Sequence, residues 1–132
     1  MSLIKLVWPE EYEDYKVVQV KFDNRSAFLF GNPWKYDEVL QGYILRNFLM
    51  GEGITYEPVF GRLSGENIPK ISGERYQVLG MGQASIMPED KTANFFGSSG
   101  DYGIGLDQNQ LYQLRKQEKD WKIEIPRIVR LF

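Results

Sequence analysis

The segment Tyr15–Phe30, with the sequence YKVVQVKFDNRSAFLF, decides most of the fold that the chain predicts. Val18, Val20 and Phe22 alternate with polar residues, which is the two-residue period of a half-buried β-strand. Asp23-Asn24-Arg25 carries turn-forming residues, and the apolar run Ala27–Phe30 follows it. We therefore expect a β-hairpin with a loop of three or four residues.

The next segment carries the strongest helix signal of the chain. Asn32 suits an N-cap, and Pro33 suits the first helical position. Apolar residues then repeat every three or four positions up to Met50. We therefore expect one long helix over Pro33–Met50, packed on the sheet. Its apolar stripe consists of Tyr36, Leu40, Tyr43, Ile44 and Phe48, of which Leu40, Ile44 and Phe48 are expected to pack against Val18, Val20 and Phe28.

Strand patterns dominate the rest of the chain. They occur over 3–8, 54–60, 74–87, 92–96 and 121–125. Asp107 suits an N-cap, and Gln110 completes a capping box at the start of a short helix that ends near Lys119. Most strands follow one another without helical crossovers. This order favours a single α+β domain over residues 1–132, with a mainly antiparallel sheet, one long helix and one short helix. A partly closed barrel is the alternative.

The composition excludes much of the usual catalytic chemistry, because the chain has no histidine and no cysteine. Histidine is the commonest general base and metal ligand, and cysteine supplies thiolates and disulfides. We accordingly expect no metal site and no cofactor, and the chain shows no recognisable catalytic constellation. Whether it is an enzyme stays open, with the balance against it.

Charge and hydropathy limit the expected partners. The net charge of −2 gives no bulk field for nucleic acid. The basic segment Arg115–Arg130 interleaves its bases with Glu118, Asp120 and Glu124, as an exposed helix does. No apolar run approaches 18 residues, and the N-terminus does not resemble a signal peptide. We expect a soluble, cytoplasmic protein that binds neither membrane nor nucleic acid.

Gly80-Met81-Gly82 is similar to the glycine motifs of two kinds of cofactor-binding site. It follows a strand, as a dinucleotide-binding fingerprint does, and the run from Gln77 to Gly82 fits the loose pattern of acyl-CoA-dependent acetyltransferases. Both motifs require a helix to begin at the glycines. Pro88 leaves no room for one, so the sequence favours a glycine bulge within a strand.

The run Gly97–Gly105, GSSGDYGIG, is the best candidate for a ligand site. Its backbone N–H groups and hydroxyls precede a helix start, which is a common arrangement for binding anions. The candidate ligand-binding residues are Ser98, Ser99, Gly100, Asp101 and Tyr102, with Asp101 as the only nearby base. Asp101 or Asp107, paired with Glu57 or Glu74, offers carboxylate acid–base chemistry. The alternative is a surface loop or capping role.

The aromatic residues favour a binding role. The chain has 8 Phe, 8 Tyr and 3 Trp, more than a core of this size needs. Tyrosine and tryptophan at a surface are typical of protein interfaces. We expect a non-enzymatic protein-binding or assembly module, with a homodimer as the expected assembly. The alternative is a small-ligand or anion-binding protein, or a carboxylate-dependent enzyme, with its site at Gly97–Gly105. The tyrosines expected to reach the surface are Tyr12, Tyr15, Tyr56, Tyr102 and Tyr112.

Overall fold

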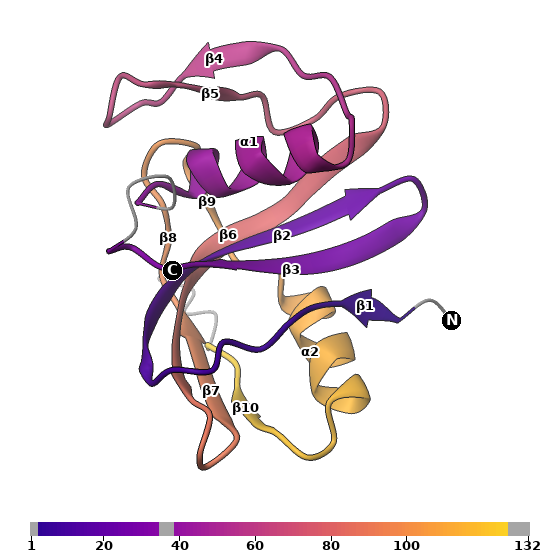
Figure 1. Ribbon diagram of the computed structural model, residues 1–132, viewed down its shortest axis with the longest axis vertical. Helices are drawn as coiled ribbons and strands as arrows, with labels where there is room; N and C mark the ends of the chain where they lie inside the picture. The colour runs from indigo at the N-terminus through magenta and orange to yellow at the C-terminus, as the bar shows by residue number, and fades with distance from the viewer. Residues whose placement is uncertain (1–2, 35–38, 127–132) are drawn as a thin grey trace, which may run out of the picture.

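The central strand of the fold is β2, Glu13–Phe22, in a six-stranded sheet (Figure 1). The structure is a computed structural model that describes residues 3–34 and 39–126. The strand order is β1-β3-β2-β6-β7-β10. The inner pairs are antiparallel, whereas both edge pairs, β1–β3 and β7–β10, are parallel. The sheet is therefore mixed, and the predicted antiparallel arrangement is confirmed only for its inner strands. The other strands of this sheet are β1 (Ile4–Lys5), β3 (Arg25–Gly31), β6 (Tyr76–Met87), β7 (Thr92–Phe96) and β10 (Lys122–Glu124).

The hairpin predicted from Tyr15–Phe30 is confirmed as β2 and β3. Phe22 pairs with Arg25, so the loop has two residues and is shorter than predicted. Asp23 and Asn24 have φ values of 42° and 64°. Positive φ at both positions is the signature of the tight turn that matches the twist of a hairpin, and Asp and Asn tolerate it better than most residues.

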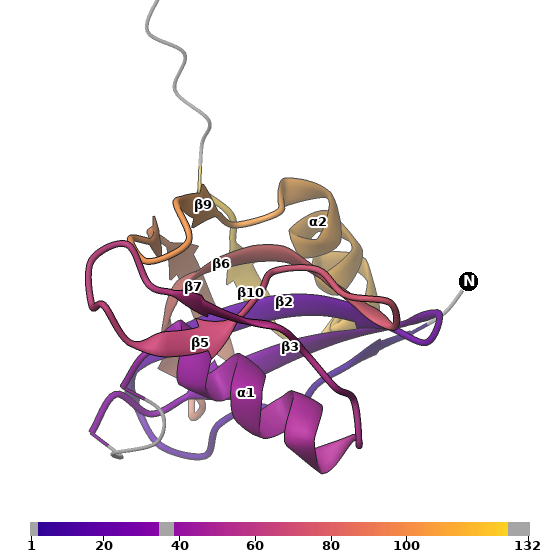
Figure 2. The same ribbon diagram turned by 90° about the horizontal axis from the view of Figure 1, so that it is seen from above.

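Two helices cover opposite faces of the curled sheet (Figure 2). α1 (Gln41–Gly51) buries Ile44, Leu45 and Leu49 in one cluster with Val18 and Val20. The expected packing of Ile44 on these two valines is therefore confirmed, although Leu40 and Phe48 are only half-buried. α2 (Gln108–Gln117) buries Leu111 and Leu114 in a second cluster with Val17, Phe28 and Phe95. The expected contact of Phe28 with α1 is wrong, because neighbouring strand residues point to opposite faces.

α1 begins eight residues later than predicted. Its N-cap is Leu40, which makes no side-chain cap hydrogen bond. The Asn32 side chain instead accepts a hydrogen bond from the Trp34 N–H at 2.8 Å and donates one to Glu13 at 3.1 Å, which forms a turn next to Pro33. The two helices have 11 and 10 residues, so the division into one long and one short helix does not hold. Tyr36 lies outside the described residues.

Two small antiparallel sheets lie beside the main one. β4 (Pro58–Phe60) pairs with β5 (Asn67–Pro69), within a region where only β4 was predicted to be a strand. A Cβ at Gly42 of α1 would lie 2.4 Å from the side chain of Ile68, so the helix needs glycine there to approach β5. The second small sheet joins β8 (Ser98–Ser99) to β9 (Ile104–Gly105).

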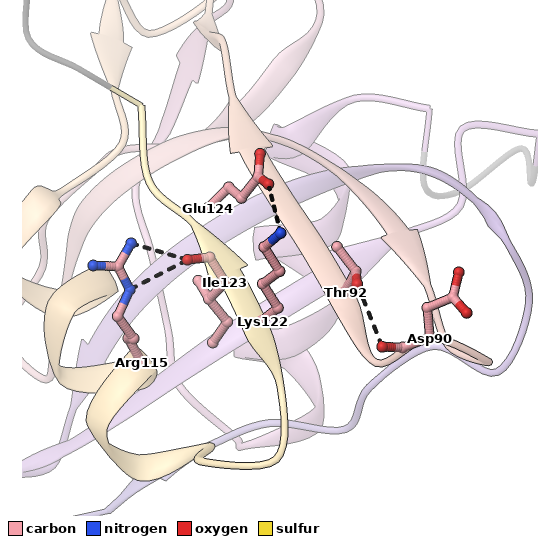
Figure 3. A network of polar contacts seen from close by, with 6 residues as sticks. All are labelled: Asp90, Thr92, Arg115, Lys122, Ile123 and Glu124. Carbon is pink, nitrogen blue, oxygen red and sulfur yellow. Dashed lines mark hydrogen bonds and ion pairs between the residues drawn. The ribbon is translucent and has the colours of Figure 1, made fainter.

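Side chains of α2 bind the outer backbone groups of both edge strands. The Gln117 amide accepts a hydrogen bond from the Ile4 N–H at 2.6 Å and donates one to the Ile4 carbonyl at 2.9 Å. The Arg115 guanidinium donates to the carbonyl of Ile123 in β10, at 3.2 and 2.9 Å (Figure 3). Because one helix holds both edges, the sheet curls into a half-barrel around α2.

Candidate functional site

The predicted ligand residues at Gly97–Gly105 lie in the β8–β9 hairpin. Ser98 is exposed, whereas Ser99 is buried. The Ser99 hydroxyl accepts a hydrogen bond from the Tyr102 N–H at 3.3 Å, and its carbonyl accepts one from the Gly103 N–H at 2.8 Å. Gly100 lies against the Leu63 side chain, which a Cβ at this position would meet at 2.2 Å. The segment therefore forms a folded hairpin that is held by hydrogen bonds within it.

Asp101 binds the turn between β4 and β5. One carboxylate oxygen accepts from the N–H groups of Leu63 and Ser64, at 2.9 and 2.7 Å, and the other accepts from the Ser64 hydroxyl at 2.8 Å. Partial burial acts to raise the pKa of Asp101, but the hydrogen bonds from Ser64 and Leu63 outweigh it and hold the pKa below its usual range. A carboxylate held in this way is a weak base, which suits a structural role better than proton abstraction.

Tyr102 binds the end of β5 to the β8–β9 hairpin, and Tyr76 binds the residue after β5 to the main sheet. The Tyr102 hydroxyl donates to the carbonyl of Pro69 at 2.5 Å, and the Tyr76 hydroxyl donates to the carbonyl of Lys70. Burial raises the pKa of Tyr102 far above its usual value, and the neighbouring Tyr76 and Asp101 raise it further. Both tyrosines remain protonated near neutral pH and act as hydrogen-bond donors.

The four carboxylates considered for acid–base chemistry lie in different places. Asp107 accepts a hydrogen bond from the Gln110 N–H at 3.0 Å and is the N-cap of α2, as predicted. Glu57 and Glu74 line one polar cleft of about 570 Å³, together with Lys70 and Arg75. Neither Asp101 nor Asp107 lines that cleft. Glu57 and Glu74 thus line the same cleft, whereas neither predicted aspartate partner does.

Gly80-Met81-Gly82 lies within β6 and not at the start of a helix. Gln19 pairs with Gly80 but Val20 pairs with Val78, so a bulge interrupts the ladder here. Its extra residue is Leu79, next to Gly80, whereas one of the glycines had been predicted. A Cβ at Gly80 would lie 2.4 Å from the Asp107 nitrogen and 2.5 Å from the Gln19 side-chain oxygen. The glycine therefore allows the segment before α2 to approach the sheet.

The clearest surface for binding is an apolar groove that the sequence did not reveal. It lies between α1, β3 and the segment that follows β1, and its volume is about 390 Å³. We call it the α1–β3 groove. Its walls include Leu6 and Val7 on one side, Leu29 and Phe30 on the floor, and Ile44 and Phe48 on the helix. Val7 is 83% exposed. The only signal in the sequence was that apolar residues occur on both faces of the segment 3–8.

The aromatic residues agree only in part with the predicted surface positions. Tyr12 and Tyr112 are exposed, Tyr56 and Tyr102 are half-buried, and Tyr15 is buried. The largest exposed aromatic of the described residues is Trp34. These residues do not gather in the α1–β3 groove, whose aromatic members are Phe28, Phe30 and Phe48.

Over residues 3–34 and 39–126, no helix is long and apolar enough to cross a membrane. Within the same ranges, no three acidic side chains gather in a way that could hold a metal ion. No protein-family model matches the chain, and no curated protein sequence matches it either.

Proposed function

We propose that the protein is a non-enzymatic protein-binding or assembly module, and that the α1–β3 groove is its contact surface. The observation that supports this proposal is the groove itself, an apolar hollow of about 390 Å³. Val7, which lines it, is 83% exposed. Concave apolar surfaces with few polar groups are typical of binding sites. The absence of histidine and cysteine supports the non-enzymatic part.

Self-association through this groove is the assembly that we propose first. A closed dimer would cover the exposed apolar side chains of Val7 and of Leu3 nearby in the chain. Sedimentation velocity over a range of about 1 to 500 µM tests it. A dimer that Val7→Asp abolishes supports the proposal, and a strict monomer at the highest concentration removes its homodimer part.

Leu63→Asp is the matched control for this experiment. Leu63 is 81% exposed, almost as much as Val7, but it lies in the turn between β4 and β5 and does not line the groove. Both variants place the same charge on an exposed apolar position. Because the Leu63 side chain lies against Gly100 and the Leu63 N–H binds Asp101, the melting temperatures of both variants are measured beside the sedimentation, and the comparison uses folded protein only. A dimer that both variants weaken equally would place the interface elsewhere.

A small-ligand role is the second candidate, favoured by the polar cleft that Glu57, Lys70, Glu74 and Arg75 line. Its charges of both signs suit a polar ligand better than a plain anion. A thermal-shift screen of nucleotides, sugar phosphates and divalent metals tests it against the Gly97–Gly105 site. A stabilising hit that Glu74→Gln removes supports the cleft, whereas a hit that Ser98→Ala removes supports the hairpin.

A further inference from the structure

We infer that the start of α2 is a two-state clamp. In the state that the structure shows, Gln19 of β2 binds Asp107, the N-cap residue of the helix. In the second state, Gln110 of the helix itself binds the Asp107 N–H in place of Gln19. This exchange releases the first turn of α2 from the sheet and shifts β1, which the same helix holds. The inference goes beyond the proposed binding function and does not depend on it.

Gln19 connects the centre of the sheet to the start of α2 by two hydrogen bonds. The Asp107 N–H donates to the side-chain oxygen of Gln19 at 2.7 Å, and the side-chain nitrogen of Gln19 donates to the Asp107 carbonyl at 3.0 Å. Gln19 is fully buried, so water does not compete for these bonds. They hold Asp107 so close to β6 that only a glycine fits at position 80.

Gln110 is a second buried amide at the start of α2, and it has no partner. It is 3% exposed, and neither of its side-chain polar atoms forms a hydrogen bond within the described residues. Gln110 is the third residue after the N-cap Asp107. From that position a glutamine side chain reaches the N-cap N–H in a capping box. Two side-chain oxygens are therefore available for one N–H, and Gln19 binds it in the structure.

The two arrangements are close in free energy. Each leaves one buried glutamine amide without a partner, Gln110 in the first state and Gln19 in the second. The Asp107 carbonyl keeps the bond from the Leu111 N–H, at 3.3 Å, in both states. The second state thus has one hydrogen bond fewer than the first. We expect a difference of this size to leave the second state populated at about 1–10%.

The other end of α2 links the clamp to the α1–β3 groove. The Gln117 side chain binds both backbone groups of Ile4, at 2.6 and 2.9 Å. Lys5, Leu6 and Val7 follow Ile4 in the chain and line the groove. A helix of 10 residues moves as a rigid element, so a displacement of its first turn also displaces Gln117 and β1. The clamp thereby sets the position of one groove wall.

NMR measurements of chemical exchange on the full chain test the inference directly. The backbone amide of Asp107 and the side-chain amides of Gln19 and Gln110 should exchange with one common rate, on the microsecond-to-millisecond timescale. The minor state should have a population of about 1–10%. The backbone amide of Ile4 should share this rate, because Gln117 binds it.

Gln110→Met removes the competing oxygen from the start of α2. It should abolish the exchange at Asp107, at Gln19 and at Ile4. Gln113→Met is the matched control, because it makes the same change on the same helix at an exposed position. It should leave the exchange rate and the minor population unchanged. The melting temperatures of both variants show that the fold is kept.

Three results would overturn the clamp. They are a wild type without a minor state above about 1%, a minor state that persists in Gln110→Met, and a long-lived water at the Gln110 side chain, since that water would give Gln110 a partner in the first state. An Ile4 amide that does not share the common rate overturns the link to the groove. None of these results bears on the sedimentation experiment, so a failure of the clamp is distinct from a failure of the proposed contact surface.

Discussion

The indole rings of Trp8 and Trp121 lie face to face, with ring centroids 3.9 Å apart and planes 10° from parallel. Trp8 follows β1 and Trp121 precedes β10, the two edge strands at opposite ends of the sheet. The Trp8 indole N–H also donates to Glu118, just after α2, at 2.7 Å. The two rings therefore join segments that are 113 residues apart in the chain and help to hold the curl of the sheet.

Loss of this stack should destabilise the protein. We expect Trp8→Ala to lower the free energy of unfolding by about 2–4 kcal/mol, below the full cost for a buried tryptophan because Trp8 is half-buried. A double-mutant cycle with Trp121→Ala should give a coupling of about 1 kcal/mol. Urea denaturation measures both. Trp34→Ala is the control, since Trp34 is 81% exposed and should change stability by less than about 0.5 kcal/mol.

Gln110 and Gln19 should respond in opposite ways to the same substitution. Gln110 is 3% exposed, and neither side-chain polar atom has a hydrogen-bond partner. Gln110→Met should therefore be neutral or stabilise the protein by about 1 kcal/mol. Gln19 accepts from the Asp107 N–H at 2.7 Å and donates to the Asp107 carbonyl at 3.0 Å. Gln19→Met should cost about 2–3 kcal/mol, because it leaves both groups unpaired. Thermal unfolding that gives the reverse order contradicts this account.

Adding a single methyl group at Gly80 should destabilise the protein. Because its Cβ would meet the Asp107 nitrogen and the Gln19 oxygen, Gly80→Ala should cost about 1–3 kcal/mol. Gly51, the last residue of α1, has open space around it, so Gly51→Ala should be neutral or stabilise by up to about 1 kcal/mol. Equal effects in chemical denaturation would show that α2 does not approach β6 so closely.

Asp101 gives a pH dependence with a definite sign. Its pKa is lowered in the folded protein, so its contribution to stability is present above the unfolded pKa of about 3.9 and is lost as the pH falls through the folded value. Asp101→Asn should cost about 1 kcal/mol at pH 7, a figure reduced for solvent screening. The difference from wild type should shrink below about pH 4. The control is Asp120→Asn, at an exposed position, which should change stability at pH 7 by less than about 0.5 kcal/mol.

The sequence predicted correctly those features that depend only on residues adjacent in the chain. The Asp23-Asn24 turn, the Asp107 N-cap and the bulge beside Gly80 each depend on a few adjacent residues, and the structure contains all three. The start of α1 was wrong because Asn32 has a competing use, a turn that binds Trp34 and Glu13. Nothing within 32–34 distinguishes that turn from a helix N-cap.

Features that depend on contacts between residues far apart in the chain could not be predicted from the sequence. The capping box predicted a bond from the Gln110 side chain to the Asp107 N–H, but Gln19, 88 residues away, takes that N–H. The parallel edge pairs and the α1–β3 groove likewise arise where β1 and β10 meet segments far along the chain. The periodicity of a strand does not reveal its neighbours, so the parallel edge pairs could not be predicted from it.

The central claim is that the α1–β3 groove is the contact surface of the protein, and sedimentation velocity of the wild type beside Val7→Asp and Leu63→Asp tests it most directly. Val7 lines the groove and is 83% exposed, whereas Leu63 is 81% exposed and does not line it. We predict a concentration-dependent dimer that Val7→Asp abolishes and Leu63→Asp keeps. A dimer that both variants weaken equally would contradict the proposed contact surface.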